Sequence, residues 1–258
     1  MKHKTLYVGY AFSLIALLVM RICQLLFVIE PATGFYKPQY ENFWIISATA
    51  IVVSALALAF FSYTDIDFTA RKKEGIPVAI FSLVLGVSFV IKAFSSVLEV
   101  SGILAFVVAA LSLILAVIYI CSACMLFVGK KIKINYFIVS VVFWLVELIS
   151  VYLQNDDISA VPQRTYWILS ATLCLITSLD ILKDKAEMLT KISSKTMVAF
   201  SLFTSLFCII STLPNIILMV LGKGNLLYGT SLSDVFYLFY GIYISVYIFS
   251  TFKQKKYK

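Results

Sequence analysis

The chain has 258 residues, of which 62% are hydrophobic and only 13% are charged. Soluble domains carry about 45–50% apolar and about 25% charged residues, so this composition excludes an ordinary soluble domain. The formal charge of +8 does not indicate nucleic-acid binding, because the lysines stand at the ends of apolar runs and not in a basic patch on a solvated fold. We therefore predict an all-α polytopic membrane protein, a single transmembrane domain in contact with the lipid bilayer.

Eight apolar runs are long enough to be membrane helices. A helix rises 1.5 Å per residue, so a hydrocarbon core of about 30 Å needs about 20 residues. The first run is too long for the apolar region of a signal peptide, and we expect it to be retained as a helix. The expected helices are approximately 5–29, 43–63, 77–98, 102–128, 136–154, 166–182, 197–220 and 232–252.

Lysine and arginine crowd the loops on one side of these helices. The opposite side carries only Lys37, Arg164 and Lys223. Because short cytoplasmic loops are enriched in Lys and Arg, this asymmetry predicts that both termini are cytoplasmic, which agrees with an even number of helices. The excess of lysine over arginine and the lack of a targeting segment favour a bacterial plasma membrane.

A motif near the start of the second expected helix returns near the start of the sixth. Pro38–Thr49 (PQYENFWIISAT) and Pro162–Thr172 (PQRTYWILSAT) share seven identical positions when one residue is dropped. Shorter matches follow in the same order at spacings of about 120 to 124 residues. The pattern predicts two parallel four-helix repeats, about 1–132 and about 133–258, since four helices per unit give both the same orientation. Chance matching in so biased a composition is the alternative.

Polar residues inside the apolar runs are the best indication of a site, because ionisable groups in hydrocarbon are costly and usually face the protein interior. Arg21, Lys92 and Glu147 all come out about 20–25 Å from the cytoplasmic boundary. Gln24 lies one turn after Arg21, and Asn215 follows Pro214, which interrupts the seventh helix at a similar depth. We predict that these residues form one polar group in the outer half of the bilayer.

Two interpretations of this group remain open. It can bind a ligand, in which case two cations against one carboxylate favour an anionic or zwitterionic molecule. It can instead be an ion-paired cluster that only fixes the packing of the helices. If the first and fifth helices are superposed, Arg21 falls on Glu147, which would place opposite charges on either side of a pseudo-twofold axis.

Three further features have a plain and a functional interpretation. Asp180 lies near the inner end of its helix, where its carboxylate can reach the headgroups. The segment 185–195 is either a basic loop or a short amphipathic segment on an anionic lipid surface. A tyrosine stripe on the last helix indicates a packed face, with a pathway lining as the alternative: Tyr237, Tyr240, Tyr243 and Tyr247.

Motifs of common catalytic chemistry are missing from the sequence. There is no G-x-S-x-G, no H-E-x-x-H and no glycine-rich phosphate loop, and His3 is the only histidine. We expect no cofactor and no metal. The leading hypothesis is transport or binding of a small anionic or amphiphilic molecule. The alternatives are a non-catalytic subunit or sensor that packs against another membrane protein or a second copy, and a lipid-modifying enzyme that uses Glu147 or Asp180.

Overall fold

The computed structural model describes residues 5–30, 32–40, 42–71, 74–99, 102–130, 135–153, 162–227 and 234–254. In these ranges the chain forms eight α-helices, as the apolar runs predict. The α-helices are α1 (Thr5–Cys23), α2 (Phe43–Asp65), α3 (Ile76–Glu99), α4 (Ile103–Phe127), α5 (Asn135–Leu153), α6 (Pro162–Lys185), α7 (Lys191–Val220) and α8 (Asp234–Thr251). The shorter elements are the π-helix η1 (Gln24–Val28), the 3-10 helices η2 (Pro38–Tyr40) and η3 (Gly224–Leu226), and the strands β1 (Ile66–Arg71) and β2 (Phe252–Gln254).

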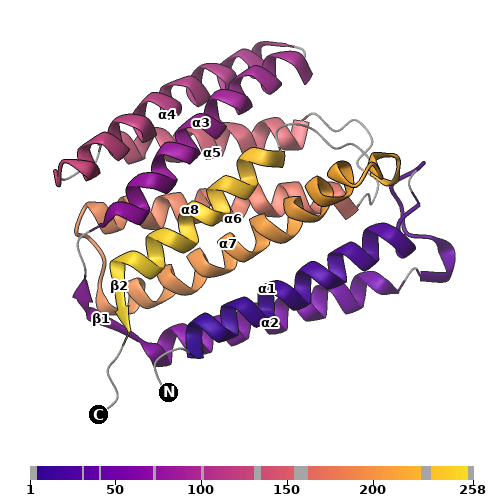
Figure 1. Ribbon diagram of the computed structural model, residues 1–258, viewed down its shortest axis with the longest axis horizontal. Helices are drawn as coiled ribbons and strands as arrows, with labels where there is room; N and C mark the ends of the chain where they lie inside the picture. The colour runs from indigo at the N-terminus through magenta and orange to yellow at the C-terminus, as the bar shows by residue number, and fades with distance from the viewer. Residues whose placement is uncertain are drawn as a thin grey trace.

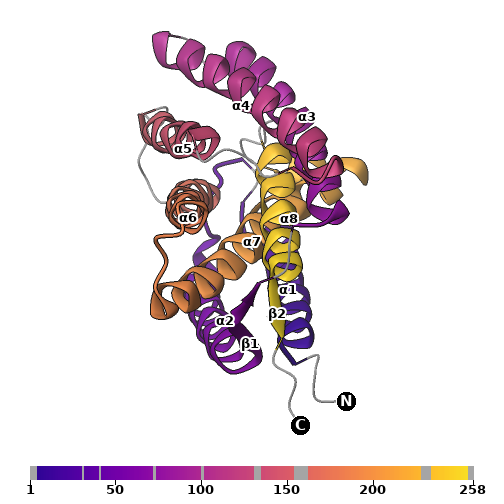
Figure 2. The ribbon, with the colours of Figure 1, turned by 90° about the vertical axis from the view of Figure 1, so that its left-hand side faces the viewer.

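Six of the helices form a closed ring. Going round it, α3 packs on α4, α4 on α5, α5 on α6, α6 on α7, α7 on α8, and α8 on α3 again. The remaining two, α1 and α2, form a hairpin that packs on the outside of α7. Figure 1 shows this hairpin on one side of α7 and the α3–α4 hairpin on the other, and Figure 2 shows the helices from one end. Helix α7 is therefore the element that joins hairpin and ring.

Aromatic side chains fill the interior of the ring. The Phe89 ring of α3 lies 5.5 Å from that of Tyr119 in α4, 5.2 Å from that of Phe143 in α5 and 5.2 Å from that of Phe236 in α8. Trp144 of α5 stacks on Phe236, with ring centroids 5.1 Å apart. Such pairs add about 0.5–1.5 kcal/mol each to the burial of their surface, so this aromatic core holds four helices of the ring together.

The junction of α1, α7 and α8 depends on close approach at a glycine. The hydroxyl of Ser205 in α7 donates to the carbonyl oxygen of Gly241 in α8 at 2.6 Å, and its oxygen is 2.7 Å from the hydroxyl of Tyr10 in α1. A Cβ atom at Gly241 would lie 2.9 Å from the Ser205 carbonyl oxygen and 2.9 Å from Cβ of Cys208. Small residues let membrane helices approach in this way, since packing and not hydrophobicity drives their association in lipid.

Helix α1 begins and helix α8 ends at the same end of the bundle (Figure 1). At that end β1 and β2 pair as antiparallel strands, with Ile66 opposite Gln254 and an irregularity between Asp67 and Arg71. The sequence pattern had predicted no strand here. The pairing ties the segment after α2 to the segment after α8.

In the part of the chain that the structure describes, six helical segments are long and apolar enough to cross a membrane, which fits a helical membrane protein: Thr5–Val28, Pro38–Thr64, Ile76–Leu98, Ile103–Phe127, Gln163–Lys185 and Ser193–Val220. Two shorter apolar helices accompany them, Phe137–Leu153 and Val235–Thr251. Helices of this length reach about 26 Å, close to the hydrocarbon thickness of about 30 Å.

Two expectations from the sequence need correction. The segment 185–195 is neither one loop nor one amphipathic segment, because α6 runs to Lys185 and α7 begins at Lys191. Thr190 caps α7, its side-chain oxygen accepting from the Ser193 N–H at 3.2 Å. Arg164 belongs to the first turn of α6 and not to an outer loop.

The two copies of the repeated motif take different local structures. In the first copy, η2 forms at Pro38–Tyr40 and α2 begins only at Phe43, whereas in the second copy α6 begins at Pro162 itself. Gln39 is exposed and its counterpart Gln163 is buried. The predicted duplication into two four-helix units stays a prediction.

The contact at Gly241 generates a test of the packing. We expect Gly241→Ala to lower the free energy of unfolding by about 1–3 kcal/mol, because the added methyl group must push α7 and α8 apart. This loss exceeds the gain of roughly 1 kcal/mol that alanine brings to a helix interior. Equilibrium unfolding by SDS in mixed micelles measures the change.

The matched control is Gly224→Ala in η3, where an added Cβ would meet no atom within 4 Å. Equal stability of the two alanine variants would contradict the close α7–α8 contact.

Candidate functional site

The structure divides the five predicted site residues between two polar centres. Lys92 and Glu147 form an ion pair inside the ring. Arg21 and Gln24 contact each other at the junction of the α1–α2 hairpin with the ring, and Asn215 lies on α7 at this junction. We call these the ring centre and the junction centre. Lys92 and Glu147 stand about two turns before the ends of α3 and α5, and Arg21 stands about two turns before the end of η1.

Arg21 is fully buried and reaches from α1 across to α6. One nitrogen of its guanidinium donates to the side-chain oxygen of Gln24, and another donates to the side-chain oxygen of Gln163. The guanidinium carbon lies 4.1 Å from the centroid of the Tyr166 ring, a cation–π contact. The guanidinium thus fixes the orientation of two side-chain amides, that of Gln24 on the same segment and that of Gln163 on α6.

Helix α1 changes from α to π geometry immediately after this contact. In η1 the Ile29 N–H donates to the Gln24 carbonyl oxygen at 2.9 Å. Single turns of π-helix are rare in proteins, and those that occur are often found at functional sites. The Gln24 amide donates to the hydroxyl of Tyr36, in the loop that folds back after η1. Burial raises the pKa of the Tyr36 phenol above its ordinary value, although Arg21 opposes this, so the hydroxyl stays protonated at neutral pH.

Two groups beside Arg21 are buried without a hydrogen-bond partner among the described residues. They are the Gln163 side-chain nitrogen and the Tyr166 hydroxyl, on side chains that are each 5% exposed. An unsatisfied buried polar group costs about 1–3 kcal/mol, so such groups need an explanation. Both can donate to an acceptor oxygen, and both lie in the first turns of α6, where the helix dipole is positive.

Helix register places Asn215 at the level of Arg21. Along α1 and α7, Tyr10 meets Ser205 and Leu25 packs with Leu218. Counting between these two contacts puts Asn215 opposite Arg21. Asn215 is buried, and its side-chain nitrogen donates to the Ser211 carbonyl oxygen at 3.4 Å.

The α6–α7 interface gives the same level independently. It is a seam of small polar pairs: Ser170 with Ser211 (3.2 Å), Cys174 with Cys208 (3.4 Å) and Thr177 with Thr204 (2.7 Å). Extending this antiparallel register outward brings Asn215 opposite Tyr166. Pro214 beside it has no N–H, which frees the carbonyl oxygen of Ile210 in the helix. Arg21, Tyr166 and Asn215 therefore lie at one level on three helices, and Arg21 and Tyr166 are in contact.

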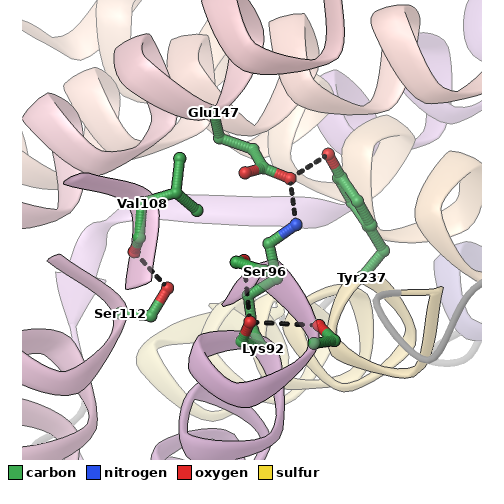
Figure 3. Close-up of polar contacts among 7 residues, drawn as sticks. Lys92, Ser96, Val108, Ser112, Glu147 and Tyr237 are labelled. Carbon is green, nitrogen blue, oxygen red and sulfur yellow. Dashed lines mark hydrogen bonds and ion pairs between the residues drawn. The ribbon is translucent and has the colours of Figure 1, made fainter. Parts of the chain in front are cut away.

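The ring centre joins α3, α5 and α8 (Figure 3). The Lys92 ammonium lies 2.7 Å from Oε1 of Glu147, and the Tyr237 hydroxyl donates to the same oxygen at 3.2 Å. Lys92 also lies 5.6 Å from the centroid of the Phe236 ring. The hydroxyls of Ser95 and Ser96, one turn after Lys92, donate to its backbone carbonyl oxygen and not to its side chain.

The tyrosine stripe of α8 is a packed face, as its plain interpretation predicted. All four tyrosines are buried. The Tyr240 hydroxyl lies 2.7 Å from that of Ser178, and the Tyr247 hydroxyl donates to Oδ2 of Asp184 at 3.0 Å. Asp180 is half-buried on α6, and its carboxylate lies 3.9 Å from the Lys183 ammonium.

Sequence reasoning missed Gln163, Tyr166 and Tyr36 as partners of the junction centre. Gln163 and Tyr166 stand in the repeated motif, which indicates a duplication and does not by itself indicate a site. Their approach to Arg21 depends on α6 starting at Pro162 and on the hairpin packing at α7. No spacing rule connects positions more than 140 residues apart.

Comparison with protein-family models, with curated proteins and with solved structures finds no match.

Because Gln163 contacts Arg21, replacing glutamine by leucine should affect the free energy of unfolding differently in the two copies of the motif. Gln163→Leu removes an acceptor from a buried guanidinium, and we expect it to lower the free energy of unfolding by about 1–3 kcal/mol. Gln39→Leu, at the equivalent but exposed position, should change it by less than about 0.5 kcal/mol. SDS unfolding curves of the two variants test this; equal losses would contradict the contact between Gln163 and Arg21.

The ring centre predicts strong coupling between its two charges. We expect Lys92→Met and Glu147→Leu each to destabilise the protein by about 3–5 kcal/mol, because each leaves a buried charge without its counter-ion. The double variant should be more stable than either single variant, since no isolated charge remains. A double-mutant cycle measured by SDS unfolding checks this, and additive effects would show that the pair is not coupled.

Proposed function

We propose that the protein is a multi-pass membrane protein of eight transmembrane helices, with both termini in the cytoplasm, that binds or transports a small anionic or amphiphilic molecule. The ligand binds at the junction centre between α1, α6 and α7. Lipid surrounds the bundle, and the bacterial plasma membrane is the proposed location.

The observation that carries this proposal is the set of donors around Arg21. The guanidinium is fully buried, and next to it the Gln163 nitrogen and the Tyr166 hydroxyl have no hydrogen-bond partner within the described part of the chain. Both amide oxygens of Gln24 and Gln163 face Arg21, so the Gln163 amide presents its donor side away from it. A cation and donors at a helix N-terminus favour an oxygen-rich anion.

The ring centre contributes less to anion binding. The ammonium of Lys92 and the carboxylate of Glu147 are in contact and their charges largely cancel. The expected excess of two cations over one carboxylate therefore does not act at one place. This favours Arg21 over Lys92 as the group that attracts the ligand.

Thermal stability of the detergent-purified protein tests the proposal. The probes are inorganic phosphate, acetate, octanoate and phosphatidylglycerol in mixed micelles. A ligand at a hundredfold excess over its Kd stabilises the folded state by about 2.7 kcal/mol, which corresponds to roughly 5–10 °C in Tm. We expect at least one probe to raise the Tm of the wild-type protein.

The decisive variant is Tyr166→Phe, which removes the unpartnered hydroxyl and keeps the ring beside Arg21. We expect it to stay folded and to need at least a tenfold higher probe concentration for the same shift. Tyr40→Phe, which alters an exposed tyrosine, is the matched control and should behave like the wild type. No shift with any probe, or an equal shift in all three proteins, would contradict the proposal and favour a subunit that packs against another membrane protein.

A further inference from the structure

The carboxylate of Glu147 is solvated by the protein on one side only. Oε1 accepts from both Lys92 and Tyr237. Oε2 is buried and has no hydrogen-bond partner among the described residues. An ionised carboxylate offers about four acceptor sites over its two oxygens, and here only one oxygen is used. The side chain is 1% exposed, so the charge on Oε2 is poorly stabilised.

The neutral form of Glu147 fits the same contacts. When a proton joins Oε2, Oε1 becomes the carbonyl oxygen of a carboxylic acid and still accepts from the ammonium and the phenol. The only bond that forms is the O–H bond, and Lys92 keeps its own proton. The ring of Phe236, 5.6 Å from the ammonium, remains as a second group that stabilises the cation.

Given the groups that face Glu147 from the neighbouring helices, its carboxylate is the group expected to take up a proton. Lys92 comes from α3 and Tyr237 from α8, and both are donors to Oε1. Cys174 of α6 is the further titratable group in electrostatic contact with Glu147. On the side of α4, Figure 3 draws Val108 and Ser112, which do not titrate, and the Ser112 hydroxyl donates to the Val108 carbonyl oxygen at 2.7 Å.

We propose that Glu147 is a proton-binding site, and that a proton taken up at Oε2 loosens the link between α3 and α5. These two helices are not neighbours in the ring, since α4 and α8 flank α3. Among the described residues, Lys92–Glu147 is the one ion pair with both side chains less than 10% exposed. Protonation turns this attraction between two charges into one between a charge and a dipole, which is weaker. This proposal does not depend on ligand binding at the junction centre.

Infrared difference spectroscopy of the full chain in lipid nanodiscs, titrated with acid, tests proton binding directly. Within the carbonyl band of protonated carboxyl groups, we expect a component that appears as the pH falls, is lost in Glu147→Gln and is kept in Asp180→Asn, the control at a half-buried acid. In Lys92→Met the band should appear at least one pH unit higher, a tenfold greater proton affinity, because the stabilising cation is gone.

A second variant guards against misfolding of Glu147→Gln. Glu147→Asp keeps a carboxyl group, so the band should persist with a shifted frequency. A purely structural ion pair would stay ionised at every pH at which the protein is folded, and the carbonyl band of the other carboxyl groups would then be the same in the wild type and in Glu147→Gln. That result, or an identical titration of the wild type and Lys92→Met, would overturn the proposal.

A spin-label pair reports the proposed movement. Leu98 of α3 and Tyr152 of α5 are both exposed. They accept labels after substitution by cysteine, in a background in which the exposed native cysteines Cys23, Cys121 and Cys124 are replaced by serine. The distance distribution should broaden on acidification in the otherwise wild-type protein, and it should be broad at neutral pH and insensitive to pH in Glu147→Gln. A distribution that stays narrow at all pH values would contradict the loosening of α3.

Discussion

The close contact of α7 with α8 is the constraint on which the rest of the structure depends. Because Gly241 has no side chain, the Ser205 hydroxyl can reach its carbonyl oxygen, and Tyr10 of α1 can reach the same hydroxyl. The contact of Tyr10, Ser205 and Gly241 closes the six-helix ring and also holds the α1–α2 hairpin against α7. The position of Arg21 relative to α6 follows from it, since α7 is the ring helix on which α1 mainly packs.

Burying charge in hydrocarbon is expensive, and the fold offsets this cost in two different ways. The ring centre compensates charge with charge, through Lys92 and Glu147. The junction centre surrounds the Arg21 guanidinium with amide oxygens and an aromatic ring. An ion pair such as Lys92–Glu147 has little net charge left to attract a ligand. Amide groups that turn their oxygens toward Arg21 keep their N–H donors available for one. The difference explains why we assign ligand binding to the junction and proton binding to the ring.

The two centres stand at a similar distance from the helix ends, yet on different helices. The ring centre stands at one end of the aromatic core, which includes Phe89 and Trp144, and the junction centre lies beside the polar seam of α6 and α7. Helix α7 borders both the ring and the hairpin. Because the ring is closed, a change in the packing of α3 can reach the junction centre through α8 and α7 or through α4, α5 and α6.

The sequence by itself determined the eight helices, because hydrophobic length is a local property that the bilayer thickness selects. It also singled out Arg21, Lys92 and Glu147, since a charge inside an apolar run is costly wherever the run packs. Only the tertiary structure decided that Glu147 pairs with Lys92, that Arg21 meets Gln163 and Tyr166, and that Gln39 stays exposed while Gln163 is buried. Depth along a helix can be counted from the sequence, but the direction in which a side chain points depends on which helices become neighbours. That choice depends on contacts between distant positions, such as Ser205 with Gly241, and no local pattern encodes it.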